Sequence, residues 1–275
     1  MVYTLAASSV SGGKEKIMIS HHTNTEQGHW VLAKMGKRVL RPGGRELTAK
    51  LIDELDIKKT DDVVEFAPGI GFTAALTLKQ DPHSYTGIEL DETAAGNLKS
   101  IVNGKNRKII NTSAADTTLD ADSVDKVYGE AMLTMQADHR KSEIIGEAFR
   151  ILKKGGLYGI HELGLAPDNI SDETKGSIQR DLAQTIKVNA RPLTEKEWSE
   201  LLEKEGFSIV KIEKNPMSLL EPGRVFNDEG FFRALGIIFN IATHPKERER
   251  IMTMRRTFRK YRDHLNAVAI VAKKH

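Results

Sequence analysis

The sequence predicts an α/β protein with a doubly wound, Rossmann-like sheet of seven strands, of which the last is antiparallel. Short apolar runs alternate with helical stretches along most of the chain, and a glycine-containing turn at 67–71 directly follows the first run. A helical insertion separates the last two runs. Strands that alternate with helices at this spacing form βαβ units and a parallel sheet.

The expected elements follow from changes in the period of the apolar residues. We expect strands at 63–66, 85–90, 108–110, 125–128, 157–163, 208–212 and 267–272. We expect helices at 28–55 with a break at 41–44, at 72–80, 91–102, 139–152 and 194–204, and in the insertion at 228–264.

Two of these helices carry clear local signals. Leu47, Leu51 and Leu55 recur at the spacing of one helical face, so this N-terminal helix has an apolar stripe to bury. Thr194 and Glu197 form the pattern of a capping box, which predicts that a helix begins there.

The domain organisation follows from these elements. We assign 1–56 to an N-terminal tail and helical cap, and 57–275 to the domain that contains the sheet, with its helical insertion at about 215–265. Residues 164–192 show a less regular pattern. The insertion is expected to form either a lid or the contact face of a homodimer.

The composition narrows the classes of function. The chain of 275 residues has no cysteine, which excludes disulfides and thiolate chemistry and favours a cytoplasmic location. Its net charge of +3 is too small to indicate nucleic-acid binding. No apolar run approaches the roughly 20 residues of a membrane span. Residues 1–16 lack the pattern of a signal peptide, and we expect a flexible tail there.

The turn after the first expected strand is typical of a nucleotide-type cofactor site. Gly69 and Gly71 allow the backbone to approach a ligand closely, and Glu89 lies where an acid could hold a ribose. This spacing also fits a nicotinamide cofactor. Glu65, in the strand before the turn, favours a different one, because a carboxylate suits an ammonium group better than a pyrophosphate.

Several motifs resemble those of class I S-adenosylmethionine-dependent methyltransferases. EFAPGIG at 65–71 resembles the first motif, with Ala67 in place of its first glycine, and GIELD at 87–91 resembles the second. Thr112, Ser113 and Ala114 stand where the family has Gly-Asp-Ala, so Asp116 is an alternative acid for the adenine. The resemblance covers about 41–212 and returns at 267.

The resemblance implies S-adenosyl-L-methionine as cofactor, with S-adenosyl-L-homocysteine as product. The segment at 36–44 resembles the entry segment of quinone-biosynthesis-type methyltransferases, a small-molecule branch, and places Gly44 and Thr48 near the cofactor. The implied cofactor-binding residues are Gly44, Thr48, Glu65, Ala67, Pro68, Gly69, Gly71, Glu89, Leu90, Ser113, Ala114 and Glu130.

The candidate catalytic residues lie at the carboxyl ends of the fourth and fifth strands, where open α/β sheets bind ligands. Glu130 directly follows the fourth strand, and His161 and Glu162 end the fifth on opposite faces. Each could act as a base or orient a substrate. Each could equally be a structural residue.

Candidate substrate contacts lie outside the sheet. His29 and Trp30, with His21 and His22, form an N-terminal cluster that suits a lid, and Arg191 precedes the capped helix. We expect no metal, because no carboxylate lies at helical spacing from these histidines.

The sequence leaves the acceptor open. A small molecule is the leading interpretation, and a nicotinamide-dependent oxidoreductase or a cofactor-binding sensor are alternatives. A further alternative is an RNA or protein substrate that docks on the basic helix at 245–264, although the acids Glu247, Glu249 and Asp263 reduce the net positive charge of this helix.

Overall fold

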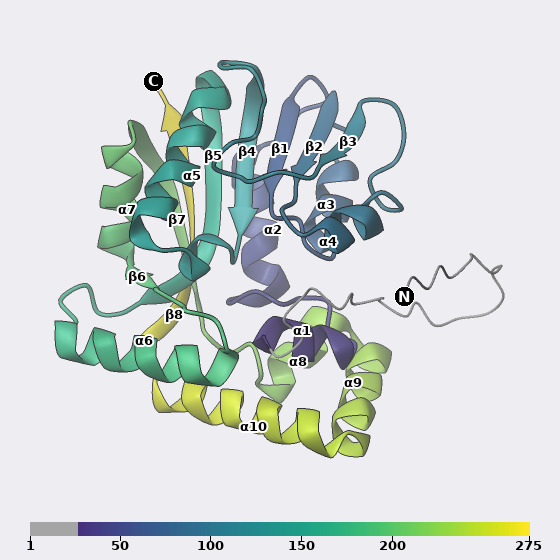
Figure 1. Cartoon of the computed structure of the whole chain (residues 1–275), viewed down its shortest axis with the longest axis vertical. Helices are drawn as coiled ribbons and strands as arrows, with labels where there is room; N and C mark the ends of the chain where they lie inside the picture. The colour runs from purple at the N-terminus through teal and green to yellow at the C-terminus, as the bar shows by residue number, and fades with distance from the viewer. Residues whose placement is uncertain (1–26) are drawn as a thin grey trace, which may run out of the picture.

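A computed structural model describes residues 27–275, which form an eight-stranded sheet in the order β3-β2-β1-β4-β5-β8-β7, with β6 paired to β5 (Figure 1). The strands are β1 (Asp62–Phe66), β2 (Ser84–Ile88), β3 (Arg107–Ile110), β4 (Val124–Glu130), β5 (Leu152–Leu165), β6 (Leu193–Thr194), β7 (Phe207–Pro216) and β8 (Leu265–Lys274). The helices are α1 (Gly28–Lys34), α2 (Gly44–Leu55), α3 (Phe72–Leu78), α4 (Glu92–Leu98), the 3-10 turn η1 (Leu133–Met135), α5 (Asp138–Ile151), α6 (Asp172–Ile186), α7 (Glu195–Lys204), α8 (Pro222–Glu229), α9 (Phe231–Thr243) and α10 (Pro245–Lys260).

The strand pairing confirms the doubly wound fold. β1 pairs with β2 and β4, β2 with β3, and β4 with β5, all in parallel, whereas β8 runs antiparallel to both β5 and β7. The seven expected strands are all present. The eighth, β6, is a two-residue addition beside the end of β5.

Helices cover both faces of the sheet. The apolar stripe of α2, with Leu47 and Leu51, packs on one face against Val63 and Tyr128. On the other face, α5 and α7 bury a second cluster that includes Trp198. The capping box at the start of α7 is confirmed. The division between 56 and 57 stays a prediction, although α2 packs on the sheet.

A cap of five helices lies beyond the carboxyl ends of the parallel strands (Figure 1). It combines α1, α6 and the insertion α8–α10, and side chains of α1, α6, α9 and α10 share one apolar cluster with the end of β5. The expectation of a less regular segment at 164–192 was wrong for α6. Ser171 caps this helix, and Ile178 and Leu182 bury its inner face.

Within residues 27–275, no helix has both the length and the apolarity needed to cross a membrane. The expected tail at 1–16, and His21 and His22 of the N-terminal cluster, lie outside the described residues.

Candidate active site

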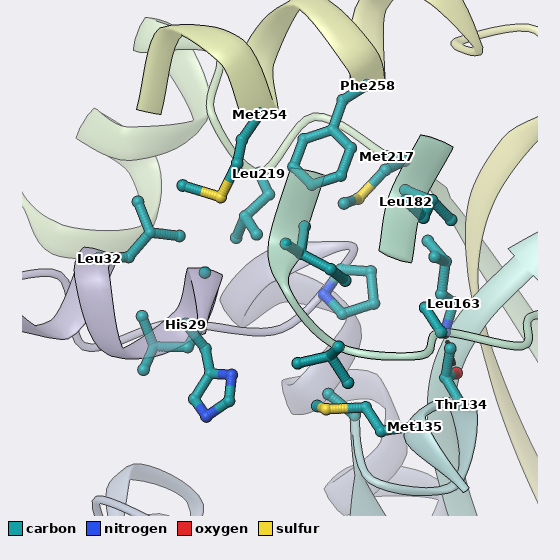
Figure 2. A pocket seen from close by; sticks show the side chains of 17 residues that line it. His29, Leu32, Thr134, Met135, Leu163, Leu182, Met217, Leu219, Met254 and Phe258 are labelled. Atoms are coloured by element: carbon teal, nitrogen blue, oxygen red, sulfur yellow. Dashed lines mark hydrogen bonds between the residues drawn. The ribbon is translucent and has the colours of Figure 1, made fainter. Parts of the chain in front are cut away.

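The cap and the sheet enclose an apolar cavity of about 90 Å³ (Figure 2). Its walls come from α1, α6 and α10, from the loop after β4, from the end of β5 and from residues 217–219. Among the described residues that line it, His29 and Thr134 have the only polar side chains, and the Thr134 hydroxyl is already bonded to Glu162 at 2.6 Å. The cavity lies at the end of the sheet where doubly wound folds bind ligands.

His29 is the polar side chain of the cavity that has no hydrogen bond within the described residues. It lies on α1 with its ring 5.1 Å from that of Trp30, which does not line the cavity. Burial lowers the pKa of His29 to about 4. The ring is therefore neutral at physiological pH and can accept a hydrogen bond from a ligand, but a pKa of about 4 makes it a weak base.

The turn between β1 and α3 has the backbone that a close ligand approach needs. Ala67, Gly69 and Gly71 all have positive φ, of 51°, 57° and 77°. A Cβ on Gly69 would meet no neighbouring atom closer than 3.9 Å, so the space beside it is open. Gly71 is required for another reason, since a Cβ there would lie 2.7 Å from the Ile101 side chain.

Glu89 lies beside this turn, at the end of β2. Its Oε2 accepts a hydrogen bond from the Gly69 N–H at 2.9 Å, and its Oε1 accepts one from the Asp91 N–H at 3.0 Å. Burial raises its pKa. Each carboxylate oxygen keeps a lone pair for a ligand hydroxyl. The next residue, Leu90, exposes 71% of its surface and offers an apolar face to a ring.

The segment after β3 is less clearly shaped for a ligand. Ser113 accepts hydrogen bonds from Arg140 at 2.8 Å and from the Ala115 N–H at 3.2 Å. Ala114 is buried in the core beside Ile88. The side chain of Asp116, the alternative acid, is exposed.

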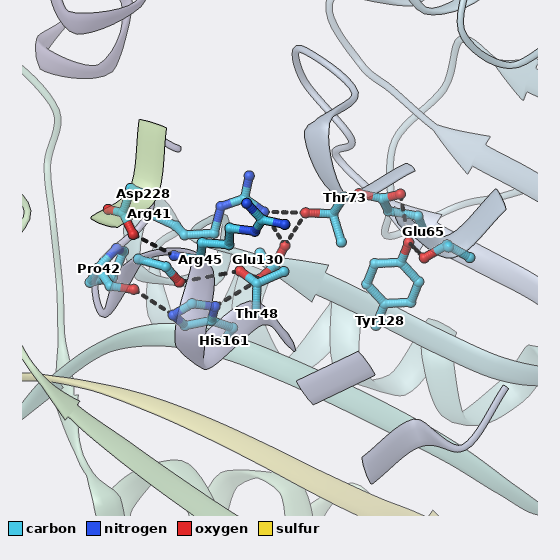
Figure 3. A network of polar contacts seen from close by, with 12 residues as sticks. Arg41, Pro42, Arg45, Thr48, Glu65, Thr73, Tyr128, Glu130, His161 and Asp228 are labelled. Atoms are coloured by element: carbon cyan, nitrogen blue, oxygen red, sulfur yellow. Dashed lines mark hydrogen bonds and ion pairs between the residues drawn. The ribbon is translucent and has the colours of Figure 1, made fainter. Parts of the chain in front are cut away.

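Glu65 is buried on β1, as its place in the motif predicts. Its Oε2 accepts hydrogen bonds from the hydroxyls of Tyr85 at 2.5 Å and Tyr128 at 2.7 Å (Figure 3). No donor among the described residues bonds its Oε1. Burial raises the pKa of Glu65 to about 7, although the two hydroxyls oppose this shift. A cationic ligand group beside it would favour the ionised form.

Glu130, at the end of β4, is the centre of a polar network (Figure 3). Its carboxylate accepts hydrogen bonds from Thr48 on α2 at 2.7 Å, from Thr73 on α3 and from the guanidinium of Arg41. The His161 ring lies 2.7 Å away. Burial alone would raise the pKa of Glu130, but Arg41, His161 and Thr73 together hold it well below its usual range.

His161 connects this network to the N-terminal segment. Its Nδ1 faces Glu130, and its Nε2 lies 2.5 Å from the Pro42 carbonyl oxygen. Both ring nitrogens thus face hydrogen-bond acceptors inside the protein. Neither Glu130 nor His161 therefore presents a free base to a substrate. Both position the segment at 41–44.

Glu162 also has a structural role. Its side chain is fully buried and accepts hydrogen bonds from the N–H groups of Met132, Leu133 and Thr134 at 2.8–3.0 Å, besides the Thr134 hydroxyl. It fixes the loop after β4 that forms one wall of the cavity. In the structure, all three candidate catalytic residues therefore hold loops or segments in place through internal hydrogen bonds.

Arg191 and Gly44 also lie differently from the expectation. The Arg191 side chain is 3.6 Å from Asp138 and does not line the cavity, whereas its neighbour Ala190 does. A Cβ on Gly44, at φ 67°, would lie 2.4 Å from Asp228 of α8, so this glycine fits the insertion. Sequence reasoning missed Arg41 and Thr73. The position of Arg41 just before the Pro-Gly-Gly break was the available signal.

The role of Glu162 is testable by the Glu162→Gln variant. The amide would place its own N–H groups against backbone donors, and we expect the free energy of unfolding to fall by about 2–4 kcal/mol. Urea denaturation measures this change, with exposed Glu200→Gln as the matched control. A loss below roughly 0.5 kcal/mol, typical of a surface substitution, would contradict the role.

Comparison with known proteins identifies the class. Residues 64–160 match a family model described as a methyltransferase domain. A Haemophilus influenzae protein described as uncharacterized is 33% identical over 253 residues, covering 90% of this chain and 98% of that protein.

Solved structures share the fold. Phosphoethanolamine N-methyltransferase 2 of Haemonchus contortus, solved with S-adenosyl-L-methionine, has a TM-score of 0.67 at 16% identity, over 94% of this chain and 60% of that one. The MccD protein has a TM-score of 0.63 at 18% identity, over 86% of this chain and 99% of that one. The cyclase SpnF has a TM-score of 0.66 at 14% identity, over 91% of this chain and 94% of that one.

The fold, the turn after β1 and the domain match define a class I methyltransferase, an enzyme that uses S-adenosylmethionine. Within this class, the chain belongs to the same family as the Haemophilus influenzae protein.

Proposed function

We propose that S-adenosylmethionine lies along the turn after β1, with its ribose hydroxyls on Glu89 and its adenine between Leu90 and the segment at 113–114. The open space beside Gly69 and the remaining lone pairs of Glu89 support this placement. Glu65 would receive the ammonium group. Arg41, beside Thr73 at the start of α3, would receive the carboxylate.

We propose further that the methyl acceptor is an apolar small molecule held in the cavity under the cap. The observation that carries this proposal is the lining, which is apolar except for His29 and Thr134. The alternative of an RNA acceptor has weaker support, because basic side chains of α10 are paired: Arg255 and Arg259 with Glu221, and Lys260 with Asp181.

Methyl transfer displaces the sulfide in line, so holding the acceptor atom close to the methyl group supplies much of the rate. The sulfonium cofactor supplies the methyl group and leaves as S-adenosylhomocysteine. An acceptor hydroxyl must also lose its proton. His29 is the described cavity residue that can accept a hydrogen bond from this hydroxyl, because Glu130, His161 and Glu162 are committed to internal hydrogen bonds. As a weak base, it would take the proton only as the new bond between oxygen and the methyl group makes the hydroxyl strongly acidic.

The cofactor placement is tested by calorimetric titration with S-adenosylmethionine and, in parallel, NAD. We expect binding of S-adenosylmethionine alone. Loss of two hydrogen bonds to a carboxylate in Glu89→Ala should weaken it by about a hundredfold or more. Glu92→Ala, an exposed acid on α4, is the matched control. Unchanged affinity in Glu89→Ala would refute the placement.

The affinity should also depend on pH through Glu65. Its pKa of about 7 in the unliganded protein means that it is largely protonated below neutrality, and an ammonium ligand binds its ionised form. Binding then releases a proton, so the Kd should fall nearly tenfold per unit from about pH 5.5 to 6.5. Glu65→Gln should remove this dependence. A flat profile in the wild type would contradict the assignment.

The role of His29 is tested with a panel of neutral phenols as acceptors and with His29→Ala. For an acceptor that carries a proton, we expect kcat/KM to fall by about tenfold, as for the loss of one hydrogen bond, while the Kd of S-adenosylmethionine stays unchanged. Exposed His139→Ala is the control. Transfer to RNA or peptides, with none to the phenols, would refute the acceptor class.

A further inference from the structure

The outer side of the cap carries a largely exposed apolar helix face, whose one ring contact outside α9 among the described residues joins Phe231 to Phe226 of α8, with 5.9 Å between the ring centroids. On α9, the side chains of Phe231, Leu235, Ile238 and Phe239 lie at helical spacing, with Phe232 beside them; we call these five the α9 face. Phe232 is 88% exposed, Phe239 67% and Phe231 62%. Isolated exposed apolar residues are ordinary, but a contiguous group usually marks an interaction surface.

The opposite side of α9 is firmly attached to the rest of the cap. Ala234 and Ile237 are buried, and the Asn240 side-chain amide donates a hydrogen bond to the Met35 carbonyl oxygen at 3.0 Å. The α9 face is therefore displayed on a fixed helix. In Figure 1, α9 lies at the edge of the cap, away from the sheet.

The charges around the α9 face are mainly basic. The helix itself has no acidic residue, and its one charged side chain is exposed Arg233. Lys246 and Arg248 follow in the first turn of α10 and have no ion-pair partner among the described residues. Of the acids nearby, Glu247 is paired with Lys34, while Glu249 is exposed. The balance favours an anionic partner.

We propose that the α9 face binds the surface of an anionic lipid membrane. A helix with phenylalanine and leucine on one face, flanked by lysine and arginine, inserts into the headgroup boundary and lies in its plane. An anionic lipid surface complements the basic residues beside this face, whereas a second copy of the chain would bring the same basic charges against them.

The position of α9 gives this contact a consequence. α9 leads directly into α10, whose Met254 and Phe258 line the cavity, and it holds the end of α1, which carries His29. Membrane binding would thus bring the two helices that close the cavity to the lipid surface. The proposal does not depend on the identity of the acceptor.

The experiment is co-sedimentation of the full chain with vesicles of phosphatidylcholine alone and of equimolar phosphatidylcholine and phosphatidylglycerol. We expect binding to the anionic vesicles that weakens with added salt. Phe232→Ser with Phe239→Ser should reduce it at least tenfold, and Lys246→Glu with Arg248→Glu should also weaken it. Val210→Ser, an exposed valine on β7, is the apolar control, and Lys105→Glu the charge control.

Circular dichroism establishes that each variant is folded, and the measurement needs no methyl acceptor, so its result is separate from that of the proposed function. Absence of sedimentation with both vesicles would overturn the proposal. It would also be overturned by equal binding of the double phenylalanine variant and Val210→Ser. If the wild type does not bind vesicles but is a dimer in sedimentation velocity, and the double phenylalanine variant is a monomer, the α9 face is instead an interface between copies of the chain.

Discussion

The buried carboxylate of Glu130 determines how the parts of this molecule meet. An unpaired carboxylate inside a protein is costly, and removing one partner of a buried pair is strongly destabilising. Its partners Arg41, Thr48, Thr73 and His161 come from the N-terminal segment, two helices and a neighbouring strand. Satisfying this one charge therefore fixes the segment at 41–44 over the ends of β4 and β5. Within that segment, Pro42 lines the cavity and Arg41 is bonded to Thr73 at the start of α3.

This arrangement explains why acidic and histidine residues at the strand ends are not free bases. Their hydrogen bonds hold loops in place: Glu130 and His161 hold the N-terminal segment, and Glu162 holds the loop after β4. An enzyme that transfers a methyl group in line gains mainly from fixed geometry, so rigid loops are a fitting use of buried charge. Proton removal is needed only for acceptors that carry a proton.

The sequence predicted those features whose signals are local. The turn at 67–71, the stripe of α2 and the capping box of α7 each lie within a short stretch of the chain. The cap was harder to predict because it joins three separate segments. α6 was missed, since only Ile178 and Leu182 are buried along it. The roles of Arg41 and Glu162 depend on partners far away in the chain, which no local period reveals.

The cap differs from the sheet in that it can determine which acceptor the protein binds. A cyclase and methyltransferases share this fold, so the sheet alone does not fix the reaction or the acceptor. Specificity must lie where the chain adds to the shared sheet, and here the additions have two apolar surfaces. The inner one lines the cavity with Met254 and Phe258, and the outer one exposes Phe232 and Phe239. The outer surface can stay exposed because α9 does not need it for its attachment. This helix is joined to α10 at one end and is bonded through Asn240 to the end of α1. The exposed surface is then a feature that the core does not need, which is the physical reason to assign it a partner.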